Sequence, residues 1–309
     1  MKVLFLGSSR FSLIVLKKML DENVNIVGVI TQPDKPSGRG YKLTPSEVKV
    51  FALEKGIKVY DFDKVRNHIS EIKEIDYDVA VVASFGQILP EDFLNIHLTI
   101  NVHPSLLPKY RGATPIQSAL LNCDKETGVT IMKVAKSVDS GDILLQEKVE
   151  IGDEYYLALE DKLARVGGEM ACKALKLIEN NACNWQAQDH DKATIVSKLT
   201  REDGVLDFSN SSSQILGKVR AMSEEIGAFI VLRGNLLKVG EAKIADLNEE
   251  ERANFEKGEI LNNKKRFVIG CANGGIEILK VQAPSGKMIS GRDYINGHND
   301  ILGKKVDNV

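Results

Sequence analysis

Short apolar runs alternate with helical patterns through the first half of the chain. The apolar runs are rich in β-branched residues, as in buried strands: KVLFL (2–6), NIVGVIT (25–31), VAVVASF (79–85), LTINVH (98–103) and GVTIMKV (128–134). The segments between them, such as FSLIVLKKML (11–20), repeat apolar residues every three or four positions, which is typical of amphipathic helices. Strands joined through helices need crossover connections, so the pattern predicts an α/β fold with a Rossmann-like, mostly parallel sheet.

The pattern of apolar positions changes after residue 180. Residues 154–180 have the periodicity of one long helix, whereas residues 186–203 are polar and poorly periodic. Beyond them, short apolar runs meet at two glycine turns, RGN (233–235) and NGG (273–275), as in β-hairpins. We therefore predict a larger domain over residues 1–185, a linker over 186–203 and a smaller, OB-like β-barrel domain over 204–309.

Composition and charge narrow the class of protein. The 309 residues carry a formal net charge of −2, which argues against non-specific coating of nucleic acid but allows a local basic patch. The four cysteines are scattered without a CxxC pair, so we expect reduced thiols and a cytoplasmic location. Arg10 interrupts the apolar start of the chain, unlike in a signal peptide, and no stretch is long and uncharged enough to span a membrane.

One polar stretch follows a predicted strand at the place where α/β sheets bind ligands. In NVHPSLLPKYRGATPIQ (101–117), Asn101 and His103 are two positions apart and so share a face of the strand. Asp139 lies in a separate loop, AKSVDSGDI (135–143). An amide, an imidazole and a carboxylate without a Ser or Cys nucleophile indicate direct transfer of a group between two amines. In this scheme His103 takes a proton, and Asn101 donates to the oxygen of a tetrahedral intermediate.

The sequence lacks the signatures of common cofactors. The first predicted turn, GSSRFS (7–12), has one glycine where a dinucleotide-binding fold carries GxGxxG, so we expect no nucleotide cofactor. The five histidines form no HxxxH motif and no cluster, so we expect no metal.

Each candidate residue also has an ordinary structural interpretation. A lone histidine at a strand end is more often structural than catalytic, Asn101 can form a turn, and Asp139 can be a simple loop acid. Lys109 and Arg111, taken alone, are expected to be solvated surface charges. The remaining histidines have no comparable neighbours, and we interpret them as structural: His68, His97, His190 and His298.

The motifs together resemble one family. NVHPSLLPKYRGATPIQ, with GVTIMKVAKSVDSGDIL (128–144) downstream, is similar to the folate-dependent formyltransferases, and the resemblance covers essentially the full chain. It implies an enzyme that uses 10-formyltetrahydrofolate as co-substrate. His103 would assist deprotonation of the attacking amine, Asn101 would hold the formyl oxygen, and Asp139 would position water and tune His103. The tetrahydrofolate would lie against Ser105, Leu106, Leu107 and Pro108, with backbone groups of Gln87, Ile88 and Leu89 facing its pterin ring.

A second motif narrows the acceptor within this family. TQPDKPSGRGYKLTPSEVK (31–49), the region of the predicted linker and the C-terminal barrel resemble the members that formylate initiator methionyl-tRNA. The resemblance implies that Arg39, helped by Lys35 and Lys42, engages the acceptor stem of the tRNA. It also implies that the domain over residues 204–309 binds tRNA. We expect a monomer that acts in translation initiation, with no membrane partner.

One departure from the family pattern and two alternatives stay open. After Arg220-Ala221 the chain carries MSEE (222–225), where the family usually has an aromatic- and proline-containing segment, so no contact is carried over there. An amino sugar or a purine precursor is the alternative acceptor, and the loop over residues 31–49 and the barrel count against it. A folate- or RNA-binding module without turnover is the non-enzymatic alternative, and the intact Asn101, His103 and Asp139 count against that.

Overall fold

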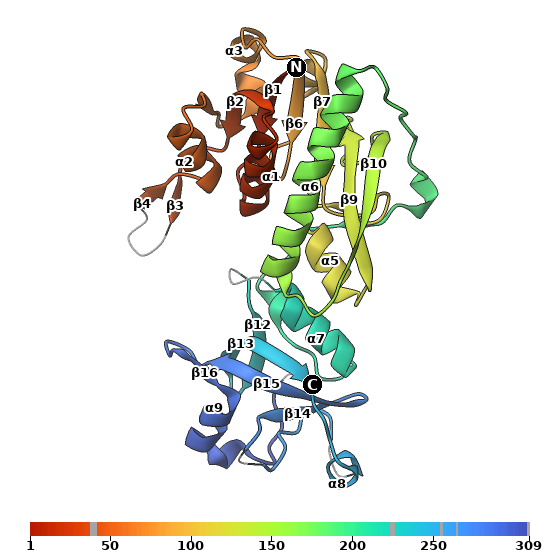
Figure 1. Ribbon diagram of the computed structural model, residues 1–309. Helices are drawn as coiled ribbons and strands as arrows, with labels where there is room; N and C mark the ends of the chain where they lie inside the picture. The colour runs from red at the N-terminus through yellow and green to blue at the C-terminus, as the bar shows by residue number, and fades with distance from the viewer. Residues whose placement is uncertain (38–41, 223–225, 254–255, 264, 308–309) are drawn as a thin grey trace. The chain divides into compact units, whose positions relative to one another are not determined.

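The computed structural model describes residues 1–37, 42–222, 226–253, 256–263 and 265–307 (Figure 1). The chain forms two compact units, each with a sheet of its own. The first comprises Met1–Pro115, Glu126–Gly152 and Ala158–Val196, and the second comprises Ile116–Lys125, Asp153–Leu157 and Ser197–Val309.

The first unit is built on a seven-stranded sheet. Its strands, in order across the sheet, are β10 (Ile143–Glu150), β9 (Glu126–Lys133), β7 (Leu98–His103), β6 (Val79–Val82), β1 (Lys2–Leu6), β2 (Asn25–Thr31) and β5 (Val59–Asp61). The strands from β7 to β5 run parallel, while β9 pairs antiparallel with both β7 and β10. The predicted mostly parallel, Rossmann-like sheet is confirmed.

Helices of this unit lie between these strands in the sequence: α1 (Arg10–Asp21), α2 (Glu47–Glu54), α3 (Ile69–Lys73) and α4 (Glu91–Leu94), with a 3-10 turn at Val65–Asn67. The long helix α6 (Tyr156–Glu179) and a 3-10 turn at His190–Lys192 follow the last strand of the sheet in the sequence. Two short strand pairs lie outside the main sheet: β3 (Lys35–Ser37) with β4 (Lys42–Thr44), antiparallel, and β8 (Arg111–Gly112) with β11 (Ile195–Val196), parallel. α1 begins with a capping box between Ser9 and Ser12. The Ser12 hydroxyl also donates to the carbonyl of Ala83 at 2.5 Å, which ties the start of α1 to the loop after β6.

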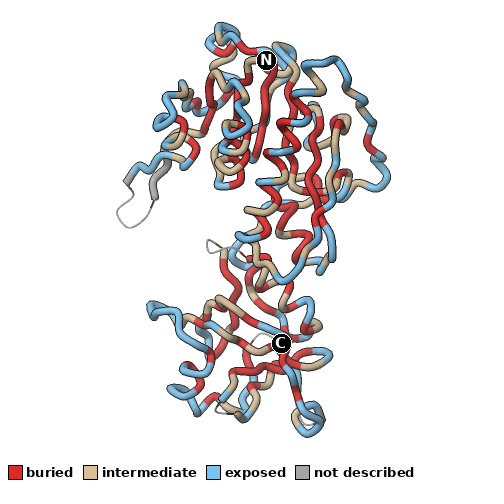
Figure 2. The backbone as a smooth tube through the Cα atoms, in the orientation of Figure 1, coloured by how far each residue is buried: buried red, intermediate tan, exposed pale blue. Residues whose placement is uncertain are grey.

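Most residues of the inner strands of the main sheet are buried, whereas those of the edge strands β10 and β5 are largely intermediate or exposed (Figure 2). Residues from several strands, the loop after β6 and helix α4 form one cluster: Leu4, Leu6, Ile30, Val82, Phe85 and Phe93. α6 approaches β7 closely at Gly167, where an added Cβ would lie 2.7 Å from Cγ1 of Val102. Because side chains alternate along a strand, Val102 faces α6, and its neighbours Asn101 and His103 face the other way.

The second unit contains a five-stranded antiparallel sheet, as predicted for a smaller β-domain. β12 (Ala228–Leu232), β13 (Asn235–Ile244), β15 (Gly274–Gln282) and β14 (Val268–Cys271) follow one another, and β16 (Met288–Ser290) pairs with β15. The remaining elements are α5 (Pro115–Leu121), α7 (Ser212–Ala221), α8 (Glu249–Ala253), α9 (Gly291–Gly297) and 3-10 turns at Glu202–Gly204 and Asn299–Ile301. Cys271 pairs with Gly274, so the second hairpin turns at Ala272-Asn273, one residue earlier than predicted.

Along the described residues, none of the helices combines the length and the hydrophobicity that crossing a bilayer requires.

Gly167→Val tests the close approach of α6 to β7. The added side chain must displace Val102, so we expect the free energy of unfolding to fall by about 1–3 kcal/mol, as in other overpacked cores. Urea unfolding followed by circular dichroism measures this change. Gly297→Ala is the control, because open space surrounds the Cβ position there. Unchanged stability of Gly167→Val would show that α6 shifts without cost.

Candidate active site

Three polar side chains predicted from the sequence lie together at the carboxyl end of β7. The Nδ2 atom of Asn101 donates to Oδ1 of Asp139 at 3.5 Å, the outer limit of a hydrogen bond. The Nδ1 atom of His103 lies 3.6 Å from Oδ2 of the same carboxylate. Asn101 and Asp139 are 38 positions apart, so the fold assembles the site from a strand end and a distant loop.

The orientation of the His103 ring is set by one hydrogen bond. Its Nε2 atom lies 2.9 Å from the carbonyl oxygen of Tyr110. Because a carbonyl only accepts, Nε2 carries the hydrogen and donates it. The Nδ1 atom therefore faces Asp139 as the nitrogen that can take up a proton. The imidazole is 4% exposed, so it stands in a largely dry site.

The Asp139 carboxylate is held by the other loop of the site. The Gly112 amide donates to its Oδ2 atom at 2.8 Å. Asp139 itself has a φ of +49°, a conformation that costs energy for a residue other than glycine. Gly112 has a φ of +112°, and a Cβ there would overlap the carbonyl oxygen of Val196. Local backbone strain of this kind is often concentrated at functional sites.

The SLLP loop (105–108) is held in place by hydrogen bonds to Thr130 of β9. The Thr130 hydroxyl donates to the Ser105 carbonyl at 2.6 Å and accepts from the Leu107 amide at 3.1 Å. Gln146 of β10 donates to the Leu107 carbonyl at 2.7 Å. The side chains of Ser105 and Leu107 are buried beneath the loop, whereas Leu106 and Pro108 are partly exposed. The last two are therefore the members of the loop that can meet a ligand.

The neighbouring loop after β6 carries the other predicted ligand contacts. The side chain of Gln87 accepts from the Val65 amide at 3.0 Å and donates to the Phe62 carbonyl at 3.2 Å. Leu89 is buried, but Ile88 is 82% exposed. Val138, next to Asp139, is also an exposed apolar side chain. Two largely exposed apolar side chains, Ile88 and Val138, therefore lie in the loops next to the site.

The structure shows that Arg111 is not a solvated surface charge. Its side chain is 8% exposed and donates to Oε1 of Gln188 and to Nδ1 of His190. The reason is that residues 186–196, interpreted from the sequence as part of a linker, fold back onto the first unit. Lys109 is exposed, and its ammonium lies 4.7 Å from the centre of the Tyr110 ring.

The predicted cationic loop is only partly described. Lys35 and Lys42 lie at opposite ends of the β3–β4 pairing, and Arg39 falls outside the described residues. The root of this hairpin is held by Lys49 of α2, which lies 2.7 Å from both Asp34 and Asp61. The hydrogen bonds to Asp34 and Asp61 raise the pKa of the Lys49 ammonium, so Lys49 stays charged and neutralises acids at the base of the loop.

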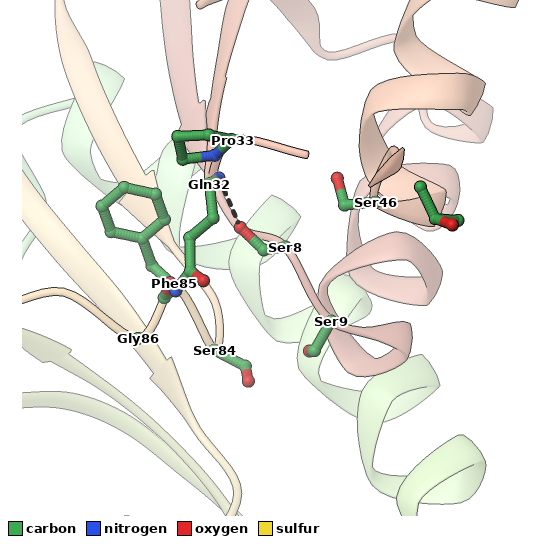
Figure 3. A pocket seen from close by; sticks show the side chains of 9 residues that line it. Ser8, Ser9, Gln32, Pro33, Ser46, Ser84, Phe85 and Gly86 are labelled. Atoms are coloured by element: carbon green, nitrogen blue, oxygen red, sulfur yellow. Dashed lines mark hydrogen bonds between the residues drawn. The ribbon is translucent and has the colours of Figure 1, made fainter. Parts of the chain in front are cut away.

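A cavity of about 360 Å³, lined by both hydroxyl groups and apolar side chains, opens at the ends of β1, β2 and β6 (Figure 3). Ser8, Ser9, Gln32, Pro33, Thr44, Ser46, Ser84, Phe85 and Gly86 line it. The Ser8 hydroxyl accepts from the Gln32 amide at 2.9 Å, and the Gln32 side chain donates to the Phe85 carbonyl at 2.7 Å. β6 pairs with β7, so this cavity and Asn101 lie at the same edge of the sheet.

Sequence reasoning missed several residues that position the site. Thr130, Gln146 and Gln188 hold it through hydrogen bonds, and the Gly112 amide does so through the backbone. No periodicity or spacing in the sequence identifies these positions as part of the site. Among the described residues, no three His, Cys, Asp or Glu side chains come together in an arrangement that could hold a metal ion.

The chain is similar to proteins of known name. Residues 1–175 match the family described as formyl transferase, and residues 198–299 match the formyl transferase C-terminal domain. A protein named methionyl-tRNA formyltransferase from Sulfurihydrogenibium sp. (strain YO3AOP1) is 38% identical over 99% of this chain and 100% of its own length. Another of the same name, from Dictyoglomus thermophilum, is 39% identical with the same coverage.

A solved structure shares the fold. The N-formyltransferase from Helicobacter canadensis, crystallised with folinic acid and dTDP-3-aminofucose, is 20% identical to this chain with a TM-score of 0.69. The match covers 92% of this chain and 100% of that one.

Thr130→Val tests the support of the SLLP loop. The substitution keeps the shape of the side chain but leaves the buried Ser105 carbonyl and Leu107 amide without their shared partner. We expect the free energy of unfolding to fall by about 1–3 kcal/mol, the usual cost of unsatisfied buried polar groups. Thr130→Ser keeps the hydroxyl and serves as the control in the same urea titration. Equal losses in both variants would assign the effect to the lost methyl group instead.

Proposed function

The chain belongs to the formyl transferase family, and from this premise we propose that it transfers the formyl group of 10-formyltetrahydrofolate to the amino group of methionine on initiator tRNA. The assembled Asn101, His103 and Asp139 at the carboxyl end of β7 carry the proposal. The relatives at 38% and 39% identity over 99% of the chain favour this acceptor. The product would be the formylated methionyl-tRNA used to start translation.

The proposed chemistry is a direct transfer between two nitrogen atoms. The methionyl amine attacks the formyl carbon, a new C–N bond forms, and the carbonyl electron pair moves onto oxygen. The Asn101 amide donates to this oxyanion in a site that excludes most water. Collapse of the tetrahedral intermediate breaks the bond between the formyl carbon and N10 of the folate, and N10 gains a hydrogen.

His103 would move the proton in this scheme, and Asp139 would support it. The attacking amine loses a proton to Nδ1 of His103, and the same proton passes on to N10 as the folate leaves. The separation of 3.6 Å between Nδ1 and the Asp139 carboxylate is too long for a hydrogen bond, so the Nδ1 lone pair stays available. Once His103 is protonated, the nearby carboxylate stabilises the imidazolium.

The two sides of the site suit two different substrates. The folate donor would lie between the SLLP loop (105–108) and the loop of residues 87–89, where the exposed Ile88 offers an apolar contact. The serine-lined cavity at the ends of β1, β2 and β6 would take the acceptor end of the tRNA, because hydroxyl and amide groups match a ribose or a base edge.

The rest of the tRNA would meet cationic groups outside the site. Lys35, Arg39 and Lys42 would contact the acceptor stem. The domain over residues 204–309 would also bind tRNA, and the domain over residues 1–185 would carry out the catalysis. The protein would act as a cytoplasmic monomer. The atypical residues 223–225 lie outside the described residues and receive no role.

A sugar amine is the second candidate acceptor, because the N-formyltransferase of Helicobacter canadensis shares the fold. An identity of 20% supports a shared fold but not a shared acceptor. The relatives named methionyl-tRNA formyltransferase match nearly the full chain at higher identity, which favours the tRNA acceptor. Transfer of radiolabelled formyl from 10-formyltetrahydrofolate to methionyl-tRNA, run beside a nucleotide-linked amino sugar, decides between them. Labelling of the sugar alone would overturn the proposed acceptor.

His103→Ala removes the proposed proton acceptor. We expect the rate of the chemical step, measured by single-turnover formyl transfer, to fall by about 10²–10⁴-fold, the usual contribution of a general base. His97→Ala is the matched control, because His97 is exposed and its ring packs against Tyr77. Near-normal turnover of His103→Ala would remove this residue from the mechanism.

Arg39→Ala tests the cationic loop. Loss of one phosphate contact should weaken tRNA binding and reduce the slope of log affinity against log salt by about one, because fewer counterions are released on binding. Filter binding across a salt series gives the slope, and Arg165→Ala, on the exposed surface of α6, is the control. If the slope of Arg39→Ala matches that of the wild type, the acceptor stem binds elsewhere.

A further inference from the structure

A buried cation lies behind the proposed active site. Arg111 donates from Nε and Nη2 to the Oε1 atom of Gln188, at 3.1 and 2.6 Å, and from Nη2 to Nδ1 of His190 at 3.0 Å. These side-chain partners are uncharged groups, since a guanidinium only donates and the His190 nitrogen must accept. A buried charge needs hydrogen-bond partners to compensate for lost water, and Gln188 supplies the larger share here.

Gln188 uses its whole amide group. Its oxygen accepts two hydrogens from Arg111, and its nitrogen donates to the Asp139 carbonyl at 2.9 Å and to the Gly141 carbonyl at 2.7 Å. The side chain is 6% exposed. A flipped amide would face the guanidinium with N–H groups and the two carbonyls with oxygen, so the orientation is fixed.

The two carbonyls that Gln188 holds flank the turn that presents the Asp139 carboxylate. Asp139 has a positive φ, and a Cβ on Gly141 would overlap the Lys133 carbonyl, so this turn is tight. Gln188 thus holds the main chain of Asp139 by a hydrogen bond, and the Gly112 amide holds its carboxylate. Both contacts depend on β8, because Gly112 belongs to this strand and the neighbouring Arg111 orients the Gln188 side chain.

The same short strand also places His103. The amides of Arg111 and Ala113 donate to the Thr194 and Val196 carbonyls at 2.8 and 3.0 Å, which pairs β8 with β11. The Tyr110 amide donates to the Thr194 hydroxyl at 2.7 Å. The Tyr110 carbonyl is the acceptor for Nε2 of His103. Residues 188–196 therefore support the positions of both His103 and Asp139.

We propose that Gln188 and Arg111 are positioning residues for the reaction, and that Gln188 holds the Asp139 turn in the geometry that the proton transfer needs. This inference rests on the proposed function. It gives residues 188–196, which have no helical or strand periodicity in the sequence, a part in the active site.

Gln188→Glu keeps the contact with Arg111 but removes the hydrogen bonds to the Asp139 and Gly141 carbonyls. The carboxylate still accepts from Arg111 and adds an ion pair, which favours the fold. It has no N–H to offer, so its second oxygen faces the Asp139 and Gly141 carbonyls and repels them. We expect kcat for formyl transfer to fall by about 10²-fold, the cost of a misplacement of about 1 Å, while KM for either substrate changes little. Gln186→Glu makes the same chemical change at an exposed side chain two residues away and should keep wild-type kinetics.

A double-mutant cycle with Asp139→Asn shows whether Gln188 acts through Asp139. If it does, Gln188→Glu costs much less in the Asp139→Asn background than in the wild type, because the group it positions is already gone. Single-turnover assays with excess enzyme give the rates. Equal fold losses in the two backgrounds, or no loss in Gln188→Glu, would overturn the proposal.

Hydrogen exchange tests the positioning without any assay of activity. The Gly112 amide hydrogen is bonded to the Asp139 carboxylate, so it should exchange faster in Gln188→Glu and at the wild-type rate in Gln186→Glu. Unchanged exchange in Gln188→Glu would overturn the proposal. A wild-type protein that does not formylate methionyl-tRNA would refute the proposed function, and the exchange comparison would still decide whether Gln188 holds the turn.

Arg111→Lys is the second variant, and it serves if Gln188→Glu does not fold. A lysine keeps the charge but cannot donate from two atoms to one oxygen, so Gln188 is held less firmly. We expect a smaller fall in kcat than for Gln188→Glu, faster exchange at Gly112 and again little added loss in the Asp139→Asn background. Wild-type kinetics and exchange in Arg111→Lys would contradict the role of the guanidinium.

Discussion

The hydrogen bond from the Gly112 amide to the Asp139 carboxylate joins the two loops on which the site depends. One loop continues from β7 and carries the residues that follow His103. The other connects β9 to β10. The bond exists only because Gly112 adopts a positive φ against β11, where any side chain would overlap the Val196 carbonyl. The loop after β7, the loop between β9 and β10, and β11 of the returning segment therefore meet at the Gly112 amide. The geometry of Asn101, His103 and Asp139 follows from that meeting rather than from β7 alone.

The sheet and the pair on β7 could be predicted because they are local patterns. β-branched apolar runs mark the strands, and a spacing of two places Asn101 and His103 on one face. Asp139 could be singled out as a polar residue in the loop after a predicted strand, but only the fold shows that its carboxylate approaches His103. Arg111 and Gln188 are 77 positions apart, and nothing in either segment marks their contact. A polar stretch without periodicity predicts a linker equally well whether it is solvated or packed, since the hydrogen bonds that pack residues 186–196 onto the first unit are made with residues far away in the sequence. The turn at Ala272-Asn273 shows the same limit on a smaller scale, because strand register decides it by one residue.

The surroundings of the three polar residues differ in chemistry from one side to the other. Exposed apolar side chains, Ile88 and Val138, border the loops after β6 and β9. Serine hydroxyls and the Gln32 amide line the cavity at the ends of β1 and β2 (Figure 3). Exposed apolar side chains can pack against a flat ring system, and the hydroxyl and amide groups among the residues that line the cavity can hydrogen-bond a ribose or a base edge.

The return of residues 186–196 onto the first unit bears on how independent that unit is. A fragment that ends after α6 would keep the whole seven-stranded sheet, both loops and all three polar residues of the site. It would nevertheless lack the neighbours of Arg111, Tyr110 and the Asp139 turn, and it would expose a guanidinium that the intact chain covers. A gene fusion or domain exchange that keeps these hydrogen bonds must therefore place its joint after Val196, inside the stretch that composition alone assigns to a linker.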